Sequence, residues 1–180
     1  MEIKHLNSFI LKNKVERHDE VKDKLMDLIV NNESGATEYD GGFISRTDYH
    51  LDENHTRTYL PLFFEIIEPI LQEQSNFFMS KEANVHHAWF QQYYKSQFHS
   101  PHNHGALGYS SVTYIKFNKD IHQPTVFIAP FNDPLGNLIE FAPDIDEGQI
   151  IFFPAMITHY VLPSKTNDIR IILSLNVRGN

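Results

Sequence analysis

The chain has 180 residues, a formal net charge of −8 and no cysteine. Its length predicts one domain with a single core, spanning residues 1–180. The acidic balance and the lack of any Lys/Arg-rich run exclude a nucleic acid as the expected partner, and no apolar run is long enough to predict a membrane span. The lack of cysteine excludes disulfides, thiolate metal ligands and a cysteine nucleophile, so we expect a protein of the reducing cytoplasm.

Residues 1–82 predict a helical N-terminal part that packs on a sheet. Apolar residues recur at helical spacing over about 17–30, with charged residues between them. The turn-forming residues of 31–42 predict a loop region. A second helix is expected over about 60–77, with a kink or a restart at Pro69.

From residue 83 onward the chain changes to short segments rich in β-branched and aromatic residues, separated by Gly, Pro, Asn and Asp. These segments predict strands over residues 85–94, 109–117, 125–130, 138–141, 149–153, 157–162 and 169–177. Strands at this spacing are typical of two packed antiparallel sheets. We therefore predict a mainly β protein with flanking helices (α+β), whose jelly-roll core, a double-stranded β-helix, covers residues 83–180.

Two histidines, His102 and His104, lie two residues apart just before a strongly predicted strand. Side chains alternate along an extended segment, so both imidazoles point to the same side. His159, in a later predicted strand, could supply a third imidazole. Three protein ligands on one face leave coordination positions open for substrate or dioxygen, and the pattern therefore predicts a metal site. Most of the 11 histidines are expected to have ordinary roles.

Arg170 lies in the last predicted strand, on the same face as Ser174, whereas the opposite face of that strand is apolar. An arginine that points into a barrel needs an anionic partner, because an unpaired buried charge is costly. That partner is either a carboxylate of a bound ligand or one of Asp144, Asp146 and Asp168.

Several motifs, taken in order, resemble a known enzyme family. The matching parts are Trp89 to Tyr94, His99, His102 to Gly105, Ser110 to Tyr114, Pro154 with His159, Arg170 with Ser174 and, upstream, Ile44 to Tyr49. Together they resemble the iron(II)- and 2-oxoglutarate-dependent oxygenases, particularly a group often encoded by bacteria and their phages. Similarity of this extent covers most of the chain.

The resemblance implies a double-stranded β-helix that binds Fe(II), takes 2-oxoglutarate and dioxygen, and hydroxylates an unknown substrate with release of succinate and CO2. It implies that His102 and His159 are iron ligands and that His104 takes the position usually filled by a carboxylate. It also implies that Arg170 holds the distal carboxylate of 2-oxoglutarate. Further implied co-substrate contacts are Tyr114, Ser110 and Ser174, followed by Gln91, Tyr93 and His99.

One position departs from the family pattern. The usual motif is His-x-Asp or His-x-Glu, and the third residue here is His104. Three neutral ligands leave the site one charge more positive, which could admit Zn(II), Ni(II) or Cu(II) instead of Fe(II). His99 or an aspartate of the segment 144–146 could also enter the coordination sphere.

Two other classes of protein stay open at this point. A three-histidine, cupin-type metal dioxygenase also uses a His-x-His pair and a later histidine, but it gives Arg170 no role. A non-enzymatic jelly roll would use its histidines structurally or for zinc. The sequence leaves open the primary substrate and the choice between a monomer and a homodimer, and a phage origin would place the protein in the cytoplasm of the host.

Overall fold

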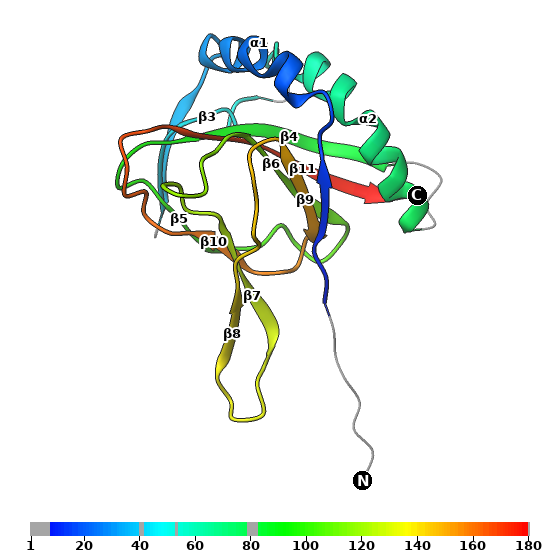
Figure 1. Cartoon of the computed structure of the whole chain (residues 1–180), viewed down its shortest axis with the longest axis vertical. Helices are drawn as coiled ribbons and strands as arrows, with labels where there is room; N and C mark the ends of the chain where they lie inside the picture. Colours follow the sequence, from blue (N-terminus) through cyan, green and yellow to red (C-terminus); the bar gives the residue numbers. More distant parts are fainter. Residues whose placement is uncertain (1–7, 40–41, 53, 79–82, 180) are drawn as a thin grey trace.

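Two antiparallel β-sheets and two helices make up the protein, as the sequence predicts. The computed structural model describes residues 8–39, 42–52, 54–78 and 83–179 (Figure 1). The larger sheet contains, in spatial order, β1 (Leu11–Lys14), β9 (Gln149–Pro154), β6 (Tyr109–Lys116), β11 (Arg170–Gly179), β4 (Ala83–Tyr93), β3 (Gly42–Thr47) and β2 (Gly35–Tyr39). The smaller sheet contains β5 (His99–His102), β10 (His159–Val161), β7 (Thr125–Asn132) and β8 (Leu138–Phe141).

Both helices cover the outer face of the larger sheet (Figure 1). Helix α1 spans His18–Val30 and helix α2 spans Leu60–Phe77, close to the predicted ranges. The kink or restart expected at Pro69 is not observed as a break, because α2 runs through this residue. Pro69 and Glu65, whose carbonyl loses its hydrogen-bond partner, are both exposed, so water can solvate that carbonyl.

The N-terminal part is less helical than predicted, because it adds three strands to the larger sheet. Strand β1 pairs with β9, and the expected loop over 31–42 contains β2 and the first residue of β3. Strand β3 in turn pairs with β4 through Arg46 and Thr47. The backbone partners that β4 and β9 offer override the weak local strand propensity of these segments.

Strand β11 separates the two hydrophobic clusters of the protein. Ile171, Leu173, Leu175 and Val177 join the helix residues in the outer cluster. Ile172, on the other face, joins residues of both sheets in the inner cluster. The predicted alternation of the last strand is thus confirmed, and Arg170 and Ser174 face the space between the sheets.

Strands β7 and β8 form a hairpin that projects from the body of the protein (Figure 1). All four residues of β8 are exposed. Strand β5, which carries the first histidines of interest, was not predicted; it pairs with β10 at the opposite edge of the smaller sheet. No helix in the described ranges is long and apolar enough to cross a membrane.

Candidate metal centre

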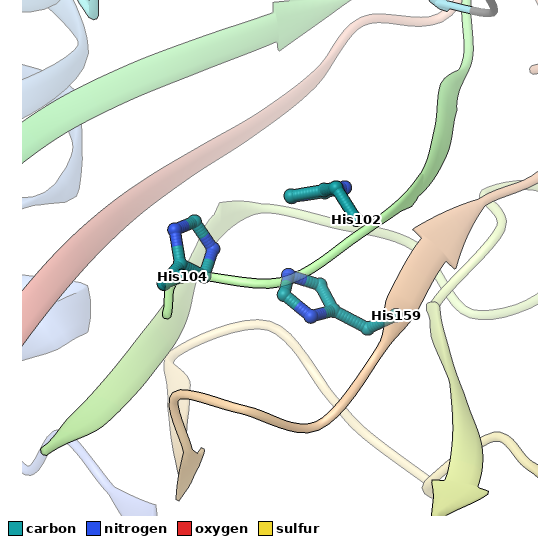
Figure 2. A group of neighbouring side chains, drawn as sticks. All are labelled: His102, His104 and His159. Carbon is teal, nitrogen blue, oxygen red and sulfur yellow. The ribbon is translucent and has the colours of Figure 1, made fainter. Parts of the chain in front are cut away.

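His102, His104 and His159 come together between the two sheets (Figure 2). His102 ends β5 and pairs with His159, the first residue of β10, while His104 follows β5. One ring nitrogen of each histidine lies within 4.8 Å of those of the other two. A backbone hydrogen bond from His104 N to Ala155 O, 2.8 Å long, holds the segment after β5 beside the turn that leads to β10. The structure therefore brings together all three histidines that the sequence singled out.

Two of these imidazoles are oriented by backbone carbonyls. His102 Nδ1 lies 2.8 Å from Ser100 O, and His159 Nδ1 lies 3.0 Å from Ile157 O. A carbonyl only accepts, so Nδ1 carries the proton in both rings and Nε2 keeps the lone pair that a metal needs. His104 differs, because its ring nitrogens have no hydrogen-bond partner among the described residues.

Burial keeps these imidazoles neutral. Desolvation lowers the pKa of His104 and of His159 to about 3, and it also lowers the pKa of His102. The same effect lowers the pKa of His99 to about 3; this ring stacks on His102 at a centroid distance of 3.8 Å. At neutral pH each imidazole of the cluster is therefore uncharged and has a nitrogen lone pair. The cluster can bind a divalent cation without first releasing protons.

Acidic residues do not join this cluster in the part of the chain that the structure describes. Asp144 and Asp146 are exposed, and Asp146 forms an ion pair with Lys119 at 2.9 Å. The expectation that an aspartate of 144–146 could enter the coordination sphere is therefore not met. The loop before β9 holds these carboxylates at the surface.

Arg170 is buried, with 2% of its surface exposed, and its guanidinium is mostly unsatisfied. Nη2 lies 3.5 Å from Thr125 Oγ1, whereas Nε and Nη1 have no hydrogen-bond partner among the described residues. The guanidinium carbon lies 4.7 Å from the ring centre of Tyr93 and 5.4 Å from that of Tyr114. Both rings favour a nearby cation, while Nε and Nη1 stay without a hydrogen-bond partner among the described residues.

The carboxylates considered as internal partners of Arg170 are engaged elsewhere. Asp168 pairs with Lys116 at 2.9 Å, and Asp144 and Asp146 lie at the surface. No ion pair joins Arg170 to an acidic residue in the described ranges. A guanidinium that is buried and unpaired is costly, so this geometry favours a ligand carboxylate as the missing partner.

The other residues suggested by the sequence fall into two groups. Gln91, Tyr93, His99 and Ser174 line the same small cavity as the three histidines. Tyr114 contacts Arg170 and donates from its hydroxyl to Thr125 Oγ1 at 3.1 Å. Ser110 lies four residues before Tyr114, about 13 Å along the strand, and donates to Asn176 Oδ1 at 2.8 Å, so the structure does not bring it to Arg170.

Sequence reasoning missed Thr125, which contacts both Arg170 and Tyr114. No signal marked it, since a threonine that opens a strand is ordinary. Sequence reasoning placed Asp48 only within the matching stretch Ile44 to Tyr49, whereas this residue is fully buried and accepts hydrogen bonds from Phe90 N at 2.9 Å and from Tyr59 Oη at 2.6 Å. Burial raises the pKa of the Asp48 carboxyl, and Arg57 lies 3.2 Å from it.

A wider cleft of about 440 Å³ is lined on one side by His99, His102 and His104. Its walls include Ile44, Tyr49, Trp89, Asn103 and His104. The Trp89 ring lies 5.5 Å from His104 and 5.0 Å from Tyr49. The buried network around Asp48 fixes the residue next to Tyr49 against β4, and so holds one wall of this cleft in place.

Residues 87–176, half of the chain, match the model of a family described as "Putative 2OG-Fe(II) oxygenase". The chain belongs to this family. The protein is therefore an oxidoreductase, a 2-oxoglutarate-dependent oxygenase that uses Fe(II). No curated protein matches this oxygenase by sequence.

Solved structures of other oxygenases share the fold. A 2OG-Fe(II) oxygenase family oxidoreductase from Burkholderia pseudomallei is 14% identical at a TM-score of 0.71, over 95% of this chain and 85% of that chain. A prolyl-4-hydroxylase from Pseudomonas putida is 12% identical at a TM-score of 0.63, over 97% and 94%. The epimerase SnoN of nogalamycin biosynthesis is 13% identical at a TM-score of 0.71, over 96% and 78%. These likenesses confirm the predicted double-stranded β-helix.

The residues of this oxygenase fit the two groups that the family implies. Imidazole nitrogen is a suitable donor for Fe(II), and the three rings offer three such atoms on one side of a small cavity. The orphaned N–H groups of Arg170 fit a carboxylate, whose oxygens accept charge-assisted hydrogen bonds from a guanidinium. Family membership thereby favours the oxygenase over the cupin-type and non-enzymatic classes.

Proposed function

We propose that His102, His104 and His159 bind Fe(II), and that Arg170 binds the distal carboxylate of 2-oxoglutarate. The unsatisfied guanidinium of Arg170 is the observation that carries this proposal. A buried arginine without a carboxylate partner costs stability unless a ligand completes it. The neutral three-histidine cluster in the neighbouring cavity supports the metal half of the proposal.

The side chains around Arg170 have distinct positioning roles in this proposal. Tyr93 and Tyr114 confine the guanidinium between two rings, and Thr125 Oγ1 accepts from Nη2, so that Nε and Nη1 stay free for the ligand. Ser174 lines the cavity and could add a hydroxyl donor. Because this region is buried, water competes little for the carboxylate, and the ion pair is stronger than at a surface.

The bound Fe(II) and 2-oxoglutarate supply the oxidising chemistry, in which dioxygen converts the co-substrate to succinate and CO2 and one oxygen atom enters a C–H bond of the substrate. The protein excludes water and orients the reactants. The substrate reaches the histidines through the cleft walled by Tyr49, Trp89 and Asn103. Its identity is not readable from the shape of this cleft alone.

Anaerobic titration of metal-stripped protein with Fe(II), followed by 2-oxoglutarate, tests the proposal. Trp89 is the only tryptophan and lies 5.5 Å from His104, so its fluorescence should report Fe(II) binding. The visible charge-transfer band of the Fe(II) chelate then reports 2-oxoglutarate. We expect His159→Ala to weaken Fe(II) binding at least about 100-fold, and Arg170→Ala to raise the Kd of 2-oxoglutarate about 100-fold. Wild-type protein that binds Fe(II) without the band would contradict the proposal.

His104→Asp tests the unusual third ligand. This change restores the common His-x-Asp pattern and removes the extra positive charge of the site. We expect Fe(II) affinity to stay within about tenfold of wild type and the competition from Cu(II) and Zn(II) to weaken. Matched titrations with His104→Ala are the control, since that variant should lose Fe(II) affinity; equal affinity in all three proteins would mean that His104 is not a ligand.

We also propose that the protein works in the cytoplasm, in that of the host cell if a phage encodes it. The absence of cysteine supports a reducing compartment. A homodimer is the alternative to a monomer, and sedimentation velocity of the purified protein distinguishes the two. All the residues proposed for the site come from one chain.

A further inference from the structure

A row of contacts leads from Arg170 to His99, a fourth histidine beside the metal centre. The Tyr93 ring packs against the guanidinium of Arg170, and Tyr93 Oη donates to Gln91 Oε1 at 3.0 Å. Gln91 Nε2 lies 3.4 Å from His99 Nδ1. His99 stacks on His102 at 3.8 Å with an interplanar angle of 24°. Both ends of the proposed 2-oxoglutarate site are therefore connected through one wall of the cavity.

The direction of these hydrogen bonds fixes the proton of His99. Gln91 Oε1 faces Tyr93, so the amide nitrogen of Gln91 faces His99. An NH2 group only donates, so His99 Nδ1 is the acceptor and carries no proton. The single proton of the neutral ring therefore lies on Nε2.

The structure shows no hydrogen-bond partner for His99 Nε2 among the described residues. Gln91 is the only hydrogen-bond partner of the His99 ring within the part of the chain that the structure describes. His99 is also one of the residues that line the cavity next to the three histidines. A donor at this place, next to a metal ligand, suits an anionic oxygen that approaches the metal.

We propose that His99 Nε2–H donates to the metal-side carboxylate of 2-oxoglutarate, with Gln91 and Tyr93 as positioning residues. This inference rests on the proposed function. Gln91 and Tyr93 lie two residues apart on β4, about 7 Å along the strand, a span comparable to that of a five-carbon dicarboxylate. One such molecule can contact Arg170 at one end of this wall and His99 at the other.

Two substitutions of His99 separate the donor from the stacked ring. His99→Phe keeps a ring beside His102 and removes the N–H, whereas His99→Gln supplies an amide donor near the Nε2 position and removes the ring. Because a charge-assisted hydrogen bond is lost, we expect His99→Phe to raise the Kd of 2-oxoglutarate about 10- to 100-fold. Fe(II) affinity should stay within about twofold of wild type, since no ligand changes. His99→Gln should bind 2-oxoglutarate within about threefold of wild type.

Tyr93→Phe tests the relay itself. This variant keeps the ring over Arg170 and removes only the hydroxyl that orients Gln91. We expect about a threefold rise in the Kd of 2-oxoglutarate and no further rise when the change is added to His99→Phe, because the relay then has no end point. His86→Phe, an exposed histidine of the same strand, is the control and should change neither affinity.

The possible outcomes separate this inference from the proposed function. Unchanged 2-oxoglutarate affinity in His99→Phe, with Fe(II) binding intact, would overturn the donor role alone. Loss of Fe(II) binding in both His99 variants would mean that His99 only supports His102, and would also overturn it. Wild-type protein that fails to bind Fe(II) or 2-oxoglutarate would overturn the proposed function, and with it the role of His99. Circular dichroism of each variant verifies that it is folded.

Discussion

The two faces of the larger sheet differ in what they bury. On the face covered by α1 and α2, strand β11 buries Leu173 and Leu175 completely among other apolar side chains. On the inner face, the same strand buries Arg170 at 2% exposure with two nitrogens unsatisfied. The outward-facing residues of this strand thus stabilise the fold, whereas Arg170 on its inner face destabilises it.

This difference teaches where function resides in the protein. Apolar burial stabilises the fold without any requirement for a ligand. Buried imidazoles with a free lone pair and a guanidinium with two unsatisfied nitrogens are unfavourable in the free protein, and they become favourable once a metal and a carboxylate bind. The apolar burial on the outer face therefore offsets the cost of the unpaired polar groups on the inner face. Substitutions on either face can test this relation.

The largest effect is expected from acid in the metal-free protein. Burial lowers the pKa of His99, His104 and His159 from the ordinary value of 6.5 to about 3. The unfolded chain therefore binds more protons between these pH values, and the free energy of unfolding falls as the pH falls from about 6.5 towards 3.

A bound divalent metal should move this acid transition to lower pH, because it binds only deprotonated imidazoles of the folded state. Acid unfolding followed by circular dichroism, with and without Fe(II) under anaerobic conditions, measures the shift. Metal-free His159→Ala should also unfold at lower pH than the metal-free wild type if its lost packing is small. Identical transitions with and without metal would contradict the expectation.

Leu173→Ala tests the outer face. Leu173 is completely buried in the outer cluster, so its truncation should lower the free energy of unfolding by about 2–5 kcal/mol. The affinity for 2-oxoglutarate, measured where the variant is folded, should stay within about twofold of wild type. Leu135→Ala, at 87% exposure in the hairpin between β7 and β8, is the control and should leave stability unchanged. A large loss of 2-oxoglutarate affinity in Leu173→Ala would show that the two faces are not separable.

Arg170→Met tests the inner face in the opposite direction. Replacing the unpaired buried guanidinium by an apolar side chain should raise the free energy of unfolding of the metal-free protein by about 1–3 kcal/mol. The same variant should lose about 100-fold in 2-oxoglutarate affinity. Urea unfolding and the Fe(II) chelate band measure the two effects, and Arg178→Met, an exposed arginine of the same strand, is the control. A destabilised Arg170→Met would mean that the guanidinium already has a partner in the free protein.

The smallest effects are expected from a pair of threonines. Thr125 Oγ1 contacts Arg170 and Tyr114, so Thr125→Val should raise the Kd of 2-oxoglutarate about two- to fivefold. Thr113 is buried on the outer face, and its Oγ1 has no hydrogen-bond partner among the described residues. Thr113→Val should therefore leave the affinity unchanged and either maintain stability or increase it by about 1 kcal/mol. Calorimetric titration measures the affinity of both variants for 2-oxoglutarate, and thermal unfolding measures their stability. Equal weakening of binding in Thr113→Val and Thr125→Val would contradict the expectation.

Much of the fold could be predicted because its elements carry strong local patterns. Helix α2 and the strand that begins at Arg170 have long, regular apolar periods, and both were predicted close to their observed bounds. Strands β1 and β5 were missed because each has only four residues and no clear alternation, so their pairing partners determine them. The same holds for β2, whose turn-forming residues predict a loop, and for β3, over which no strand was predicted.

The candidate site could be predicted in part for a similar reason. The spacing of His102 and His104 in an extended segment determines that their side chains share one direction. Nothing in the sequence indicated that Thr125 lies against Arg170, or that Gln91 connects Tyr93 with His99. These contacts join residues that are distant along the chain or depend on which face of β4 points inward.

The sequence by itself determined the two helices, most of the strands, the histidine pair and the arginine on the polar face of the last strand, because each depends on the period of side chains along one segment. Only the tertiary structure decided that His159 meets this pair, that the aspartates of 144–146 stay at the surface, and that Arg170 lacks an internal carboxylate. Whether a buried polar group finds a partner depends on the packing of both sheets, and no local pattern encodes that packing.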